Sequence, residues 1–297
     1  MRALYDSKSK TIDDRGIKNL LSNEAKYSTW LMFEAMLAQA QAEYGFIPQS
    51  AADEIKEKAI IENIDFEEMN RIYQKIGHGF VPFLKVLVNA CSEESGKYVH
   101  YGITTQNIQQ SSQLYMMKTV HNKFMLLLSE IIENLSNLAE RTKHMVMAGR
   151  THGRHAIPIT YGYKVSVWIS DFIDCYQRMK ECEKRVFTIM MGGAVGAFNS
   201  MPEVGMKVQK RVAELVGMQA MEVPSRNLST HKLEYMMNLA LMANICHKMG
   251  EEVYSTTLEE IAEVSEGFTK GTVGSSTMPH KINPKLAKGI IANSQKL

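Results

Sequence analysis

The sequence predicts an all-α protein whose centre is an elongated bundle of long helices. Apolar residues recur at steps of three and four over two long stretches, which is the spacing that places one stripe on one helical face. No glycine or proline interrupts the chain between Gly102 and Gly149 or between Gly162 and Gly192. The strict alternation of apolar and polar residues that is typical of strands is scarce.

The N-terminal part of the chain predicts shorter helices. Ser22 or Asn23 can cap a helix that ends near Gly45, because serine and asparagine accept from free backbone N–H groups and glycine terminates helices. Shorter helical patterns follow at about residues 51–60 and 66–74. These elements predict a helical region distinct from the long helices.

We place a domain boundary where small and acidic residues interrupt the helical pattern, at residues 92–96. Residues 1–95 are expected to form a smaller N-terminal helical domain and residues 96–297 the central bundle. Within the bundle, apolar ladders at residues 114–138 and 165–189 each predict a helix ~40 Å or more in length at a rise of about 1.5 Å per residue.

A third long segment, at about residues 233–264, contains only Gly250 as a weak point, and residues 286–297 predict the start of a further helix. The apolar stripes of the long helices are of the kind that packs against other helices. They therefore predict an oligomer.

Composition and charge give no support for a nucleic-acid or membrane partner. The net charge is +2, no dense basic run is present, and no apolar stretch approaches the ~18 residues of a membrane span. The polar N-terminus lacks the core of a signal peptide. The 4 cysteines are scattered through helical patterns, which predicts reduced thiols in a cytoplasmic protein. Metal-binding and cofactor-binding motifs are not evident, so we expect neither.

The string GSSTMPHKINP at residues 274–284 carries the densest candidate chemistry. It gathers hydroxyls, a cation and an amide in a loop between helical segments. Gly267, Gly271 and Gly274 precede or open this loop, while its prolines stiffen the other side. A loop that is free on one side and stiff on the other suits a lid that carries side chains onto a substrate.

The string GRTHGRHAIP, at residues 149–158, is expected to form a loop between the first two long helices. Thr151 and His152 lie in it, and histidine suits proton transfer near neutral pH because its unperturbed pKa is ~6.5. A basic turn with solvated histidines is the alternative. Zinc could be proposed for His152 and His155, but no third or fourth ligand is in register.

Two further segments combine histidines with hydroxyls or glycines. HYGITTQNIQQ starts at His100 and places Thr104 and Thr105 just before a long helix, where free N–H groups and the helix dipole favour an anion. Simple helix capping by Thr104, Thr105 or Asn107 is the alternative. In GHGFVPFL, a lone histidine such as His78 is more often structural than catalytic.

The order of these four strings resembles the adenylosuccinate lyase and 3-carboxy-cis,cis-muconate cycloisomerase branch of the fumarase/aspartase superfamily. The resemblance runs from about residue 22 to residue 297. It implies an all-α homotetramer with active sites assembled from loops of three subunits. It also implies a C-terminal helical domain, which this chain is expected to lack.

The resemblance implies a β-elimination that releases fumarate from an N- or O-substituted succinate such as the purine-pathway substrate adenylosuccinate, without metal or cofactor. Ser275 matches the family's base, His152 its acid, and His78 a histidine that assists the acid chemistry. A cation and an amide at the substrate carboxylate would stabilise developing charge. The positions that match substrate contacts are His100, Thr104, Thr105, Thr151, Ser276, Met278, Lys281 and Asn283.

Several departures bear on the leaving group. Adenylosuccinate lyases usually have an acidic residue where this chain has Gly79, and Thr-Ser-x-Asp where it has Thr104 to Asn107. The family's substrate-contacting glutamine is missing from residues 223–229, and an Arg-Tyr pair is not evident around residues 4–6. These departures weaken the case for a nucleotide leaving group. The alternatives are a cycloisomerase that closes a lactone and a helical scaffold without catalysis.

Overall fold

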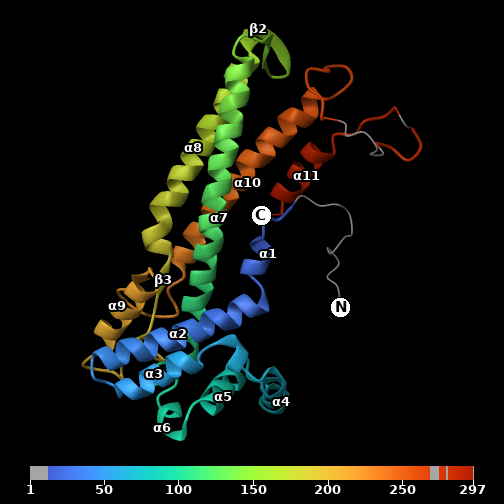
Figure 1. The fold of residues 1–297 in the computed structure, drawn as a ribbon. Helices are drawn as coiled ribbons and strands as arrows, with labels where there is room; N and C mark the ends of the chain where they lie inside the picture. The colour runs from blue at the N-terminus through green and yellow to red at the C-terminus, as the bar shows by residue number, and fades with distance from the viewer. Residues whose placement is uncertain (1–12, 268–273, 279, 297) are drawn as a thin grey trace. The chain divides into compact units, whose positions relative to one another are not determined.

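The computed structural model describes residues 13–267, 274–278 and 280–296, and these residues are mostly helical (Figure 1). The predicted all-α class is therefore confirmed. The chain divides into two compact units, each described by itself: unit 1 is Met1–Phe124 with Lys184–Ser229, and unit 2 is Met125–Glu183 with Thr230–Leu297. The domain boundary at residues 95 and 96 stays a prediction.

Unit 1 is built from short and medium helices around the first part of a long one. In chain order its elements are α1 (Ile17–Leu20), α2 (Asn23–Glu43), α3 (Gln49–Lys58), the 3-10 helix η1 (Ile61–Asn63), α4 (Phe66–Ile76), α5 (Val81–Ala90), α6 (Glu93–Gly96), the first part of α7 (Thr105–Thr142), β3 (Thr188–Ile189), α9 (Gly205–Leu215) and β4 (Gln219–Ala220). Strands β3 and β4 form a parallel pair.

The N-terminal helices follow the sequence pattern closely. Ser22 Oγ accepts a hydrogen bond from the Ala25 N–H at 3.1 Å, which confirms the predicted cap of α2. Buried aromatic side chains hold α2 against α5: the Trp30 ring lies 4.6 Å from Phe80 and 5.2 Å from Phe83, centroid to centroid. Each such aromatic pair adds about 0.5–1.5 kcal/mol beyond its burial. Helices α5 and α9 were not predicted from the sequence.

Unit 2 consists of long helices and one hairpin. Its elements are the rest of α7, β1 (Val146–Thr151), β2 (Arg154–Thr160), most of α8 (Tyr161–Val186), α10 (Thr230–Thr256) and α11 (Lys285–Ser294). Helices α8 and α10 run antiparallel, as the ion pairs Lys164–Glu252 and Asp171–Lys248 require. At Gly162 a Cβ would lie 2.5 Å from the Ala139 carbonyl oxygen, so only glycine allows α8 this close to α7.

The predicted apolar ladder of the second long helix is confirmed as its packing face. Val165, Trp168, Phe172, Cys175, Met179 and Cys182 are all at most 5% exposed. The third long helix ends earlier than predicted, at Thr256. The chain reverses there because the N–H groups of Glu263 and Val264 donate to the Thr256 carbonyl oxygen, with Ala262 in the left-handed region.

In the described part of the chain no helix is long and apolar enough to cross a membrane. None of the 4 cysteines, which all lie within the described residues, forms a disulfide, and Cys175 and Cys182 are buried. Burial, together with the Glu54 carboxylate, raises the pKa of the Cys91 thiol to about 11. Little of the reactive thiolate therefore exists at Cys91 near neutral pH.

Glu54 on α3 fastens the start of α6 and makes the stability of unit 1 sensitive to acid. Its carboxylate accepts from the Ser92 N–H at 2.6 Å, the Ser92 hydroxyl at 2.7 Å and the Ser95 hydroxyl at 2.6 Å. These hydrogen bonds, led by the one from Ser95, lower the pKa of Glu54 from its ordinary 4.5 to about 2. The lowered pKa means that the ionised carboxylate stabilises the folded state above pH 4.5 and that this contribution disappears as the pH falls toward 2.

We therefore expect Glu54→Gln to lower the melting temperature at neutral pH, with a gap to the parent that narrows as the pH falls from 4.5 toward 2. Thermal unfolding followed by circular dichroism across that range measures the gap. Glu57→Gln on the same helix removes an exposed carboxylate that pairs with Lys58 and is the matched control. A gap that stays constant with pH would contradict this role of Glu54.

Candidate active site

The loop at residues 274–284 folds back on itself in unit 2. Asn283 Nδ2 donates to the Gly274 carbonyl oxygen at 3.0 Å, and the Lys281 N–H donates to the Met278 carbonyl oxygen at 3.0 Å. A Cβ at Gly274 would lie 2.5 Å from the Lys281 carbonyl oxygen, so glycine is required at this crossing. The two ends of the string are thus held together. The predicted loop is confirmed, while Gly271 and Pro279 lie outside the described residues.

Ser275 is half-buried in this loop and Ser276 is exposed. Ser275 Oγ accepts a hydrogen bond from the Met278 N–H at 3.2 Å. A donor directed at an oxygen favours its negatively charged form, which is what a serine must adopt to act as a base. The exposed Lys281 belongs to the same loop and supplies a positive charge.

Glu266, which precedes the loop, is hydrogen-bonded to the first turn of α11, which follows the loop. Its two carboxylate oxygens accept from the N–H groups of Leu286, at 3.0 Å, and Ala287, at 2.8 Å, in the first turn of that helix. A carboxylate in this position satisfies two of the free N–H groups at a helix start and complements the helix dipole. No sequence motif pointed to Glu266.

The segment around His152 is a β-hairpin, so the expectation of an irregular loop was wrong. Strands β1 and β2 pair antiparallel, and Thr151 lies opposite Arg154. His152 and Gly153 between them have φ values of 52° and 71°, as the two central residues of a type I′ turn require. The turn exposes His152 at the tip of the hairpin, beside the exposed Thr151.

An ion pair holds the hairpin near its turn. Arg150 Nη2 donates to Glu263 Oε1 at 2.6 Å and lies 3.4 Å from His155 Nε2. The hydrogen bond from Arg150 lowers the pKa of Glu263, which therefore stays ionised near neutral pH. This contact joins the hairpin to the segment that follows α10. Among the described residues no group of three or more His, Cys, Asp or Glu side chains could hold a metal ion.

His78 in unit 1 is an exposed residue at the start of α5. Its Nδ1 accepts from the N–H groups of Phe80 and Val81, both at 3.1 Å. Because Nδ1 accepts, the proton of the neutral ring lies on Nε2, which can donate outward. The ring thus caps the start of α5 through Nδ1 and keeps Nε2–H as a donor.

The segment that starts at His100 leads into the N-terminus of α7. Asn107, which is 1% exposed, accepts at Oδ1 from the N–H groups of Thr104 and Gly193, both at 3.1 Å. Of the three residues named as possible caps, Asn107 therefore makes a side-chain hydrogen bond at the start of α7. The half-buried hydroxyls of Thr104 and Thr105 make no side-chain hydrogen bond within the described residues, and they lie where the helix dipole favours an anion.

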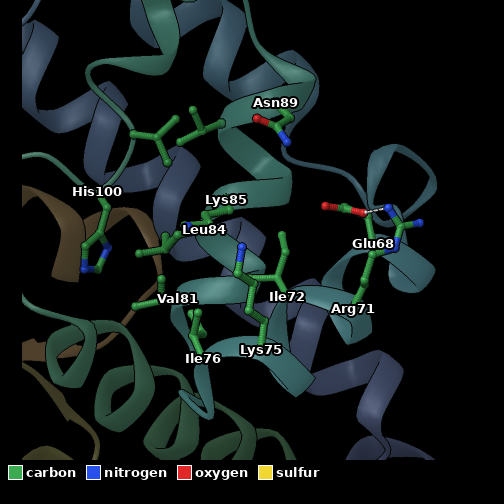
Figure 2. A pocket seen from close by; sticks show the side chains of 12 residues that line it. Glu68, Arg71, Ile72, Lys75, Ile76, Val81, Leu84, Lys85, Asn89 and His100 are labelled. Atoms are coloured by element: carbon green, nitrogen blue, oxygen red, sulfur yellow. Dashed lines mark ion pairs between the residues drawn. The ribbon is translucent and has the colours of Figure 1, made fainter.

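His100 lies at the edge of a groove of about 800 Å³ between α4 and α5 (Figure 2). The groove has an apolar floor that includes Ile72 and Leu84, with Lys75 and Lys85 beside it. His100 also has a φ of 59°. Five non-glycine residues in the described part of the chain have a positive φ, and two of them, His100 and His152, are predicted site residues. Such backbone strain concentrates at functional sites.

The predicted site residues fall into two groups, one in each unit. His78, His100, Thr104 and Thr105 belong to unit 1, while Thr151, His152, Ser275, Ser276, Met278, Lys281 and Asn283 belong to unit 2. Within unit 2, one hydrogen bond inside the loop brings Asn283 to Gly274, and another joins Ser275 to Met278. The roles assigned to these residues stay predictions. Residues 4–6, named for a missing Arg-Tyr pair, lie outside the described residues.

Sequence reasoning missed Glu34, which contacts His100. Glu34 Oε1 lies 2.6 Å from His100 Nδ1, and Glu34 is 1% exposed. A signal was present, because Glu34 is a lone carboxylate within an apolar run of α2 from Leu31 to Leu37. Buried carboxylates are rare unless they are paired, so such a residue predicts a specific partner.

Comparison with known proteins gives a consistent result. The lyase family matches residues 6–295. The chain is 36% identical over 271 residues to an adenylosuccinate lyase of Methanocaldococcus jannaschii, which is 90% of this chain and 58% of the relative. It is 34% identical over 274 residues to an N-acetyl-S-(2-succino)cysteine lyase of Enterococcus italicus, which is 92% of this chain and 60% of the relative.

A solved structure of a lyase is also similar to this chain. A fumarate lyase from Mesorhizobium sp. BNC1 matches with a TM-score of 0.87 and 26% identity, over 98% of this chain and 65% of that one. The chain therefore spans 58–60% of the length of the two curated relatives.

Proposed function

The chain belongs to the lyase family of the fumarase/aspartase superfamily, and we propose that it releases fumarate from a substituted succinate by β-elimination. The observation that carries the proposal is what two of its curated relatives share. One is named for adenylosuccinate and the other for a succinylated cysteine. These substrates differ in the leaving group, through nitrogen or through sulfur, and have the succinyl part in common.

The proposed reaction begins at a carbon next to a carboxylate. Ser275 Oγ takes a proton from that carbon, and the electron pair moves into the carboxylate, giving a doubly charged intermediate. The pair then returns to form the double bond of fumarate as the bond to nitrogen or sulfur breaks. His152 gives the leaving atom a proton. Solvent exchange afterwards removes the proton from Ser275 and restores the one on His152.

Positive charge and donors are needed where the intermediate becomes doubly charged. Lys281 and Asn283 are proposed to hold the carboxylate next to the reacting carbon. Thr104, Thr105 and His100 are proposed to hold the other. The free hydroxyls of both threonines at the start of α7 support this assignment. Thr151, Ser276 and Met278 are proposed as further contacts, with His78 assisting proton transfer.

The proposed assembly is a homotetramer in which copies share their sites. Its support in unit 2 is the set of exposed apolar side chains on α10, where Leu233, Met237 and Leu241 are between 47% and 61% exposed. Patches of this kind mark surfaces that other helices cover. Light scattering is expected to give an oligomer, and a monomer at micromolar concentration would contradict the assembly.

Fumarate release from a panel of substituted succinates tests the proposed reaction. The panel contains adenylosuccinate, N-acetyl-S-(2-succino)cysteine and further N- and O-substituted succinates, with Ser275→Ala as the control protein. Release from one compound, lost in the control, supports the proposal and identifies the leaving group. Silence across the panel together with lactone formation from 3-carboxy-cis,cis-muconate would favour a cycloisomerase. Silence in both assays would favour a scaffold.

A further inference from the structure

Unit 1 contains a buried pair of ionisable side chains that the proposed reaction does not yet use. Glu34, on α2, contacts His100 at a distance of 2.6 Å between Oε1 and Nδ1. The side chain of Glu34 is 1% exposed and that of His100 is 12% exposed. The fully buried Phe80 ring lies 5.6 Å from the imidazole, centroid to centroid, and makes its surroundings partly apolar.

Each residue of the pair has one polar atom without a hydrogen-bond partner among the described residues. Glu34 Oε2 and His100 Nε2 are buried and have no hydrogen-bond partner within the described residues. Unpartnered buried polar atoms cost free energy, and most native side chains avoid them. Buried ion pairs are also often no more stable than apolar side chains of the same volume. His100 is moreover in the left-handed backbone region. Three unfavourable features at one residue indicate a role other than stability.

The partner of Nδ1 decides what Nε2 can do. A carboxylate only accepts hydrogen bonds, so His100 Nδ1 must donate its proton to Glu34. Nε2 is then the only ring atom left for a ligand. When the ring carries both protons, the negative charge of Glu34 compensates the positive charge of the ring, and Nε2–H can donate to an anion.

We propose that Glu34 is a positioning residue that holds His100 protonated at Nδ1 and presents His100 Nε2 to a carboxylate of the substrate. This inference rests on the proposed function, because it assigns the dicarboxylate as the ligand of His100. Thr104 and Thr105, with their free hydroxyls, follow His100 closely in the chain and lie at the start of α7. Glu34 itself touches no ligand and acts through the imidazole.

A double-mutant cycle on fumarate binding, measured by calorimetry, tests the coupling. Glu34→Gln and His100→Asn are each expected to weaken fumarate binding by about tenfold to a hundredfold, the range for losing a hydrogen bond to a charged group. Asparagine suits the left-handed backbone at position 100. In the double variant Glu34→Gln is expected to have no further effect, because Glu34 acts only through His100.

Glu43→Gln is the matched control, since it removes a carboxylate from the same helix that pairs with Arg211 near the surface. Its affinity for fumarate is expected to stay within about twofold of the parent, as for a surface ion pair. If the losses of fumarate affinity caused by Glu34→Gln and His100→Asn multiply in the double variant, the inference is overturned. Unchanged affinity in Glu34→Gln would also overturn it.

A second measurement separates this inference from the proposed function. In the protein with ¹⁵N-labelled histidine, the signals of His100 are identified by their loss in His100→Asn. The parent is expected to show a protonated Nδ1 at neutral pH, and Glu34→Gln a mixture of tautomers, because an amide can either accept or donate. An unprotonated Nδ1 in the parent would overturn the inference that His100 Nδ1 donates its proton to Glu34. A parent that shows this signature but neither binds nor releases fumarate overturns the proposed function and, with it, the assigned ligand.

Discussion

Ser275→Ala is expected to reduce turnover by roughly a hundredfold to ten-thousandfold, the contribution of a positioned general base. Ser275 lies half-buried in a loop, and within the described residues its hydroxyl accepts only from the Met278 N–H. Its removal therefore costs little packing, and the melting temperature should change by no more than a surface substitution changes it. Initial rates of fumarate release and thermal unfolding of the same preparations measure the two effects.

Ser265→Ala is the matched control for this substitution. Ser265 is an exposed serine that precedes the loop and has no proposed role in the reaction. Its turnover is expected to stay within about twofold of the parent. Full turnover in Ser275→Ala would remove Ser275 from the role of base. A large fall in melting temperature would instead show that the hydroxyl is structural.

His152→Asn is expected to have the second large effect, because it removes the proposed acid and preserves the turn. Asparagine is favoured at the first central position of a type I′ turn, so the φ of 52° at His152 is tolerated. Turnover of an N-substituted succinate should fall by roughly a hundredfold to ten-thousandfold. The loss should be smaller for an S-substituted succinate, because a thiol with a pKa of ~8.5 can leave as the thiolate.

His155→Asn is the control within the same hairpin. His155 is also exposed, lies on β2 and has its ring near Arg150. We expect turnover close to the parent for this variant. Equal losses in both variants would indicate that the charge of the hairpin matters and that His152 has no specific role. An equal loss for nitrogen and sulfur leaving groups would contradict proton donation by His152.

The helices of this protein were predictable where the signal is long and local. Ladders at residues 114–138 and 165–189 extend over many turns, and α7 and α8 contain these apolar stripes. Among the short helices, α3 and α4 were predicted while α5 and α9 were not, because ten or eleven residues give few repeats of the pattern and make such predictions uneven. The hairpin at His152 was missed because β2 is largely exposed and neither strand shows a strict alternation of buried and exposed residues.

The candidate site was predictable as a set of chain segments. Hydroxyls, histidines and a lysine stand close together in the sequence, and their chemistry can be read one segment at a time. Their detailed contacts were not predictable. Asn107 was named as a possible cap, for example, but the hydrogen bond that it also accepts from the Gly193 N–H joins residues 86 positions apart.

The sequence by itself determined the helical class, the long helices and the four segments that resemble one superfamily. These features depend on residues a few positions apart, and helix periodicity acts over that range. Only the tertiary structure decided that Glu34 faces His100 across 66 residues and that Arg150 pairs with Glu263 across 113. The physical reason is that such contacts depend on how whole helices pack. A charged side chain needs a partner because burial makes an unpaired charge costly, and that burial exists only in the folded chain.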